Sequence, residues 1–241
     1  MKQGVRRTYE QVTITADDAT NHPTLLLDGI ALRTQAGHAL THPSAPLMHE
    51  IAQEWDAQTT HIHIEQMPLT RLLFALIDRQ PEQRARWQNT IIEHATHDSL
   101  CYRDAQHHGH YELWDRWLAW AENRFDAQWQ ITHSIMPALQ AQATLQRIQD
   151  WLEGRSNGEI LALYRMTESL GSFILAAAIY DDALTPEDAI EAAWLEQRIQ
   201  MQRWGHNESI EAKQHACLED VTNARMFLRF LQDTQDANLS T

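Results

Sequence analysis

The sequence is short of positive charge, and this limits the partners that the chain can have. It holds 19 Lys and Arg against 33 Asp and Glu, which gives a formal net charge of −14. Only Lys2 and Lys213 are lysines. A chain this acidic is a poor match for the phosphates of nucleic acid and for an anionic membrane surface. We therefore expect neither a nucleic acid nor a membrane as partner.

Glycine and cysteine are also scarce, and the motifs that need them are missing. The 8 glycines form neither GxxxxGK nor GxGxxG, so nothing predicts a phosphate-binding loop. The GxSxG elbow of serine hydrolases is absent as well. The two cysteines, Cys101 and Cys217, are too few for a disulfide framework. We interpret them as buried thiols in a reducing compartment.

Long hydrophobic runs are missing too. The longest uncharged apolar run, residues 169–180, is too short to span a membrane and is typical of a buried core helix. The first residues contain no apolar segment of the kind that a secretory signal needs. We therefore expect a soluble, intracellular protein with no membrane insertion.

The first 66 residues have the patterns of a small β-rich domain. Residues 9–14 alternate between apolar and polar side chains, and residues 61–64 do the same, as half-buried strands do. Asp28-Gly29 is a two-residue turn signal that predicts a hairpin. One helix is predicted from Ser44 to about Gln58. The expected N-terminal domain covers residues 1–66.

Residues 67–241 are mainly helical in pattern. Apolar side chains recur at helical spacing after Pro68, and Thr185-Pro186 has the sequence of a helix start. Residues 159–180 predict one continuous helix, whose glycine and serine at 171 and 172 would let a neighbouring helix approach closely. The expected fold class is α+β, with a small β-rich N-terminal domain followed by a larger, mainly α-helical C-terminal domain.

Two other short segments of the helical part are strand candidates. These are residues 99–103 and residues 128–135. The helix between them carries a cluster of tryptophans, which we interpret as core packing. Pro81 is predicted to open the preceding helix.

Histidine is plentiful, with 14 copies. Two local clusters are candidates for a metal site: His61 with His63 on a strand, and His107, His108 and His110 before a helix. Zinc sites use such local pairs. A metal-dependent hydrolase built on both clusters is therefore the alternative function. The HExxH motif and a carboxylate at a signature offset are missing, so the pattern favours ordinary surface histidines.

The acidic residue Glu196 lies in the helical stretch LEQRIQMQRWG, residues 195–205, which is apolar on two sides. It lies on the edge between these sides, near Gln200 and Arg203. By spacing alone it is an edge carboxylate bonded to Gln200 or to an arginine of a neighbouring helix. No second acid shares the edge within a turn, so the stretch does not predict an acid–base pair.

Several stretches taken together resemble a known family. They are TYEQVTI, LLLDGIALRT, EIAQEWDAQ, MPLTRL, DSLCYR, LGSFILAAAI and LEQRIQMQRWG. In this order they are similar to the ATP12-type assembly chaperones, which handle the alpha subunit of the ATP synthase catalytic head. The resemblance runs from about Arg7 to about Leu231, and its motifs are specific only in combination.

The resemblance implies both an activity and a site. Members are non-enzymatic chaperones that bind the unassembled alpha subunit and prevent its aggregation until the alpha/beta ring forms. It implies no catalytic residue, no cofactor and a monomer in the bacterial cytoplasm, or in the mitochondrial matrix for eukaryotic relatives. It also implies that Glu196 contacts the partner or supports such a contact. The expected partner-binding residues are Glu196, Gln200, Arg203 and Trp204.

The sequence departs from the family pattern in two loops. Ile30, Ala31 and Gln35 stand where the family often has an arginine and two prolines. His206-Asn207 replace an acidic pair after the tryptophan and glycine. These changes bear on the loops more than on the expected fold.

Overall fold

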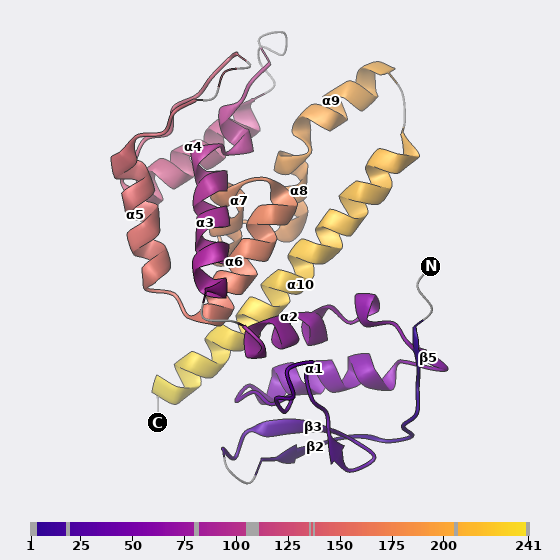
Figure 1. Ribbon diagram of the computed structural model, residues 1–241. Coiled ribbons are helices and arrows are strands. Elements are labelled where there is room, and N and C mark those ends of the chain that lie inside the picture. The colour runs from indigo at the N-terminus through magenta and orange to yellow at the C-terminus, as the bar shows by residue number, and fades with distance from the viewer. Residues whose placement is uncertain are drawn as a thin grey trace. The chain divides into compact units, whose positions relative to one another are not determined.

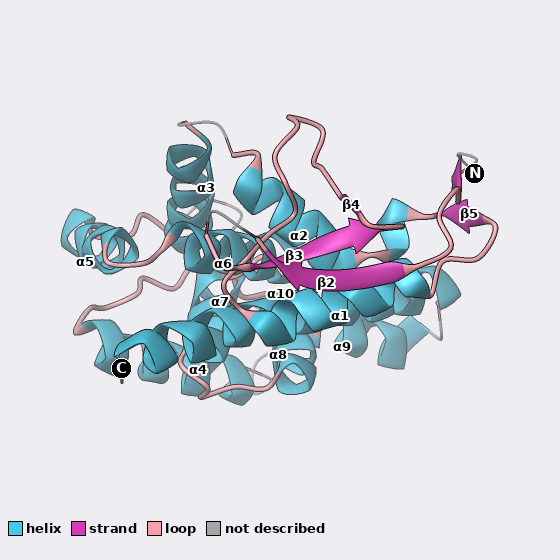
Figure 2. Ribbon diagram, turned by 90° about the horizontal axis from the view of Figure 1, so that it is seen from below, coloured by secondary structure: helices cyan, strands magenta, loops and turns pink. Residues whose placement is uncertain are grey.

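The computed structural model describes residues 4–17, 20–79, 82–104, 111–134, 136, 138–204 and 207–239. Its elements succeed one another in this order: β1 (Val5–Arg6), β2 (Val12–Ala16), β3 (Pro23–Leu27), β4 (Ile30–Ala31), α1 (Ala45–Asp56), β5 (His61–Ile62), the 3-10 turn η1 (Ile64–Gln66), α2 (Pro68–Ile77), α3 (Gln83–Thr96), the 3-10 turn η2 (Ser99–Cys101), α4 (Glu112–Phe125), α5 (Gln142–Glu153), α6 (Asn157–Leu170), α7 (Phe173–Tyr180), α8 (Pro186–Ala193), α9 (Leu195–Trp204) and α10 (Glu208–Leu239). The strands described by the structure all lie in the N-terminal part, and helices make up most of the chain after β5 (Figure 2). The predicted α+β class is confirmed.

The contacts divide the chain into two compact units. The first comprises residues 1–82 and 226–241, and the second comprises residues 83–225. Helix α2 thus belongs with the β-rich part by its contacts, and α10 contributes to both units. The predicted domain boundary after residue 66 stays a prediction, because a division by contacts does not show which segment folds independently.

The sheet of the first unit is antiparallel, in the order β2-β3-β4. Asp28 and Gly29 connect β3 to β4 with positive φ angles of 49° and 78°. Positive φ at both central residues is the mark of the tight hairpin turn that the sequence predicts. Helix α1 packs on β2 and β3 and also contacts α2 (Figure 1). In the first unit, α1 therefore lies against the sheet and α2 packs on α1.

The side chain of Glu54 in α1 holds the first turn of α2. Its carboxylate accepts hydrogen bonds from the backbone N–H of Leu69 and of Thr70, both at 2.8 Å, and from the Thr70 hydroxyl at 2.6 Å. Helix starts leave such N–H groups without partners, so this carboxylate acts as their cap. Burial raises the pKa of Glu54.

The second unit is built around α6 and α7. Helix α7 is buried along its whole length and contacts α3, α4, α6 and α8. The prediction of one helix over residues 159–180 is wrong, because Gly171 adopts a left-handed φ of 65° and Ser172 caps a new helix. The prediction that a neighbouring helix approaches closely at Gly171 is also wrong. Apart from its chain neighbours, no atom lies within 4 Å of a Cβ placed there.

Both strand candidates of the helical part are wrong. Residues 99–101 form the 3-10 turn η2, and within the described residues 128–134 there is only an isolated bridge, in which Thr132 pairs with Tyr102. The histidine segment at 61–64 is strand only at β5. Thr185 caps α8 as predicted, but the helix stops at Trp194 and restarts as α9. Pro81 lies outside the described residues.

Candidate functional site

All four predicted partner-binding residues lie on helix α9. The side chain of Glu196 is half-buried and that of Gln200 is exposed. The side chains of Arg203 and Trp204 lie outside what the structure describes. Geometry can therefore be given for Glu196 and Gln200 alone, and the shared role of the four residues stays a prediction.

Among the side chains that the structure describes, a tyrosine bonds to Glu196, and neither Gln200 nor a described arginine does. The Tyr111 hydroxyl, at the start of α4, donates a hydrogen bond of 3.0 Å to Oε1 of Glu196 and accepts one of 2.7 Å from the N–H of Asp104. Burial raises the pKa of Tyr111 to about 12, and the Glu196 carboxylate adds to the increase. The phenol therefore stays protonated and remains a donor.

The ring of Tyr111 has two close neighbours. The Trp114 ring lies 4.9 Å away, between centroids, and its Nε1–H donates to the carbonyl of Ala192 at 2.7 Å. The Arg103 guanidinium lies 5.3 Å from the Tyr111 ring centroid and pairs with Asp115 at 2.5 Å. This tyrosine cluster, defined as Arg103, Tyr111, Trp114, Asp115 and Glu196, fastens the start of α4 to α8 and α9.

Sequence reasoning missed the centre of this cluster. Tyr111 gives no signal, because it stands alone between a histidine-rich segment and a tryptophan-rich helix. Arg103 ends a stretch that carries the family resemblance, and Trp114 is a core residue as predicted, 3% exposed. The pairing of Tyr111 with Glu196 joins residues 85 positions apart, which no local pattern encodes.

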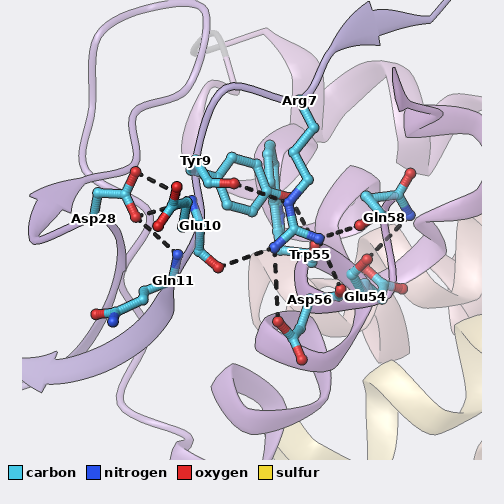
Figure 3. Close-up of polar contacts among 9 residues, drawn as sticks. All are labelled: Arg7, Tyr9, Glu10, Gln11, Asp28, Glu54, Trp55, Asp56 and Gln58. Atoms are coloured by element: carbon cyan, nitrogen blue, oxygen red, sulfur yellow. Dashed lines mark hydrogen bonds and ion pairs between the residues drawn. The ribbon is translucent and has the colours of Figure 1, made fainter. Parts of the chain in front are cut away.

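A second polar network lies in the first unit and centres on Arg7 (Figure 3). Its guanidinium donates to the backbone carbonyls of Tyr9 at 3.1 Å, Asp56 at 3.1 Å and Glu10 at 3.3 Å, as well as to that of Gln58. It also lies 4.3 Å from the centroid of the Tyr9 ring. Arginine suits this position because its planar fork can serve several acceptors at once.

The same network joins three of the resemblance stretches. The Tyr9 hydroxyl donates to the carbonyl of Trp55 at 2.6 Å. The Asp28 carboxylate accepts from the N–H groups of Glu10 and Gln11, at 3.0 and 2.8 Å (Figure 3). The turn aspartate thus fixes the segment before β2, which is a structural task.

Asp98 joins two further stretches in the second unit. Its buried carboxylate accepts from the Ser172 hydroxyl at 2.8 Å, from Ile174 N–H at 3.0 Å and from Leu100 N–H at 3.1 Å. Burial raises the pKa of Asp98 to about 6, while these hydrogen bonds oppose the increase. The carboxylate satisfies the N-terminus of α7 at the point where the apolar run breaks, so it too is structural.

Neither the two cysteines nor the first histidine pair forms a reactive site within the described residues. Burial raises the thiol pKa of Cys101 and of Cys217, so neither thiol is activated as a nucleophile. His61 and His63 lie with ring centroids 6.4 Å apart, but no group of three metal-binding side chains occurs within the part of the chain that the structure describes. The cluster at 107, 108 and 110 lies outside that part. The hydrolase alternative is not favoured.

The described surface includes a hollow with a volume of about 530 Å³. It lies where α4 ends and α5 begins, and the loop between the two helices borders it. The polar side chains that line it are those of Glu122, Asn123, Asp126, Gln128, Gln130, Thr144 and Arg147. Asp126 and Arg147 form an ion pair there. None of the described helices is both long and apolar enough to cross a membrane.

Comparison with known proteins shows which proteins this chain is similar to. Residues 6–122 match a family model described as ATP12 chaperone protein. The chain is 27% identical over 230 residues to protein atp12, mitochondrial, of Schizosaccharomyces pombe, an alignment that covers 87% of this chain and 78% of the relative.

Solved structures agree with the sequence match. Atp12 from Paracoccus denitrificans superposes with a TM-score of 0.85 at 26% identity, covering 94% of this chain and 98% of that one. Atu1473, a putative chaperone from Agrobacterium tumefaciens, gives a TM-score of 0.85 at 28% identity, covering 94% and 86%. The protein therefore has the fold of the solved Atp12 structure. It is similar to the ATP12 chaperones in sequence and in fold, and the resemblance that its motifs predicted is confirmed.

Proposed function

We propose that this protein is a non-enzymatic assembly chaperone that binds the unassembled alpha subunit of the ATP synthase catalytic head. It prevents aggregation of that subunit and supports assembly of the alpha/beta ring. The observation that carries the proposal is the similarity to ATP12 chaperones over 94% of the chain, with a TM-score of 0.85. We further propose that it acts as a monomer in the bacterial cytoplasm.

The physical chemistry of a ring subunit supports this function. A free subunit exposes the apolar surface that its neighbours later cover, and such patches promote aggregation. A protein that binds this surface lowers the concentration of the aggregating species by mass action. A net charge of −14 suits the task, because it helps to keep a complex with an aggregation-prone partner in solution.

The tyrosine cluster supports a working surface on α9. Tyr111 fixes the carboxylate of Glu196 at one end of the helix, while Gln200, one turn further along, is exposed. A helix that is anchored at its first turn presents its later residues in a constant orientation. We propose that Glu196 supports the contact and that Gln200, Arg203 and Trp204 make it.

The test is an aggregation assay. Isolated alpha subunit is diluted from denaturant, and light scattering is followed with wild type, with Glu196→Lys, or with neither. We expect the wild type to suppress scattering, and the folded variant to need about tenfold more protein, which corresponds to about 1.4 kcal/mol of lost affinity. Circular dichroism and urea unfolding establish that the variant is folded.

Two further variants make the result specific. Glu153→Lys makes the same charge change at an exposed position on α5, and it should protect like wild type. Glu196→Gln keeps an oxygen that accepts from Tyr111, so it should retain most protection if Glu196 only supports the contact. A wild type that fails to suppress scattering would remove the alpha subunit as client.

A further inference from the structure

The loop between α4 and α5 differs in composition from the rest of the chain. Residues 127–141 contain no Asp, Glu, Lys or Arg, although these types make up 22% of all residues. Uncharged loops are unusual in an acidic protein, because loops lie at the surface and charge keeps them in water. The composition therefore points to a surface that meets something other than water.

Three large apolar side chains of this loop are exposed. Ile131 is 42% exposed, Met136 is 69% exposed and Leu139 is 80% exposed. Together they are called the loop patch. The other exposed large apolar residues, among those whose surroundings the structure describes, are Val5, Ile30 and Ile64, which are all in the first unit.

The loop that carries the patch is fastened from within. The amide side chain of Gln140 accepts from Gln130 N–H at 2.9 Å and donates to the Gln130 carbonyl at 3.0 Å. The Thr132 hydroxyl donates to the Met136 carbonyl at 3.3 Å. The two arms of the loop therefore run side by side, as Figure 1 shows between α4 and α5, with Ile131 and Leu139 beside the same clamp.

The base of the loop is anchored as well. The N–H of Thr132 donates to the Cys101 carbonyl at 2.8 Å, and the N–H of Arg103 donates to the Thr132 carbonyl at 3.0 Å. Trp129 is 5% exposed, and its backbone N–H donates to the Glu122 carboxylate at 3.4 Å. A loop with a buried tryptophan and paired backbone groups holds its exposed apolar residues in place instead of tucking them inward.

We propose that the loop patch binds a short, uncharged apolar segment of the unassembled client. This inference rests on the proposed function, since the client is the alpha subunit. The absence of charge in residues 127–141 is complementary to a segment that is apolar, because a charged segment would lose its water without gaining an ionic partner. The polar hollow of Glu122, Asn123 and Gln128 lies beside the loop and forms a hydrophilic rim.

The size of the patch decides between a client segment and a second copy of this chain. A stable dimer buries about 800 Å² on each partner. Three partly exposed side chains supply only a fraction of that area. A small apolar patch suits a transient contact with a short segment, which is what a chaperone that must release its client requires.

The experiment uses the full chain and three proteins. One variant combines Ile131→Ser, Met136→Ser and Leu139→Ser. The matched control combines Val5→Ser and Ile30→Ser, whose side chains are 74% and 75% exposed but lie in the first unit. Suppression of alpha-subunit light scattering is measured for each, and sedimentation velocity gives the oligomeric state. We expect the loop variant to need at least about tenfold more protein, with little change for the control.

The outcomes separate this inference from the function on which it rests. If the loop variant protects as well as wild type, the inference is overturned and the proposed function stands. If wild type does not protect the alpha subunit, both are overturned. If wild type is a dimer that the loop variant abolishes, the patch is a self-interface and the inference is wrong.

A second measurement locates the contact directly. A photo-crosslinking amino acid at position 139 should link to the alpha subunit, and mass spectrometry identifies the linked peptide. An apolar peptide without charged residues supports the inference. A charged peptide, or a link to a second copy of this chain, overturns it.

Discussion

Asp98 gives the sharpest quantitative test of this structure. Its carboxylate is fully buried, and burial raises its pKa from an ordinary value of 3.8 to about 6. Because one pKa unit corresponds to about 1.4 kcal/mol, ionising Asp98 costs the folded state about 3 kcal/mol relative to the unfolded state at neutral pH. Asp98→Asn removes this cost, since an amide does not ionise.

Whether stability rises or falls with pH depends on whether the folded or the unfolded protein keeps the Asp98 proton to higher pH. Below pH 3.8 the group is protonated in both states and contributes no difference. Between about pH 4 and 6 the unfolded chain ionises first, so the wild type loses stability as pH rises. Above pH 6 the loss is complete. The variant instead carries a constant stability penalty of about 1–3 kcal/mol. The NH2 of its side chain stands in place of the oxygen that accepts from the Ile174 N–H, and an NH2 group cannot accept that bond.

The measurement is urea unfolding of both proteins at pH 4.5 and 7.5. Tryptophan fluorescence reports the second unit, which holds most of the 9 tryptophans. At pH 4.5 the wild type has already lost about 1 kcal/mol of the roughly 3 kcal/mol that ionising Asp98 costs it, and at pH 7.5 it has lost all of it. The stability of Asp98→Asn relative to wild type should therefore improve by about 2 kcal/mol between these two pH values. Exposed Asp150→Asn on α5 is the control. A pH-independent difference would refute the reasoning.

Three other substitutions have outcomes fixed by single contacts. Tyr111→Phe removes the hydroxyl that bridges Asp104 and Glu196, so the free energy of unfolding should fall by about 1–2 kcal/mol in urea melts, and an unchanged value would contradict the bridge. Gly171→Ala should lower the free energy of unfolding by about 1–2 kcal/mol, and the left-handed φ alone is the cause because an added Cβ meets nothing within 4 Å. Gly154→Ala is the control: its φ of −72° suits alanine, so the free energy of unfolding should not fall. Glu54→Ala removes the cap of α2. It should lower the free energy of unfolding by about 2 kcal/mol and the thermal midpoint of the first unit by several degrees. A loss below about 0.5 kcal/mol would show that water replaces the cap.

Local patterns in the sequence predicted much of the fold. The turn at Asp28-Gly29 needs two positive φ angles, and glycine and aspartate tolerate them, so the hairpin follows from the residues alone. Thr185 caps its helix because its hydroxyl reaches the N–H of Asp188 three residues later. Several of the resemblance stretches also contribute residues to the contacts of Tyr9, Asp28 and Asp98.

Patterns of hydrophobicity were misleading where tertiary contacts compete with them. The apolar run over residues 169–180 predicts a continuous helix, but Asp98 stabilises a helix start at Ser172 from 74 positions away. The strand candidates failed because their apolar residues do not share one environment: Leu100 and Trp129 are buried, whereas Ile131 is exposed. A buried 3-10 turn and a buried strand look alike when only the sequence is read.

For the candidate binding surfaces, too, some features could be predicted from the sequence and others only from the structure. The sequence by itself determined the acidic balance and placed Glu196 on a helix, because composition and periodicity are local properties, and its motifs carried the family resemblance. Only the tertiary structure decided that Tyr111 holds Glu196 and that Ile131 and Leu139 stay exposed beside the Gln130–Gln140 clamp. Such contacts depend on which distant side chains the fold brings within hydrogen-bond reach, and no pattern along the chain encodes that distance.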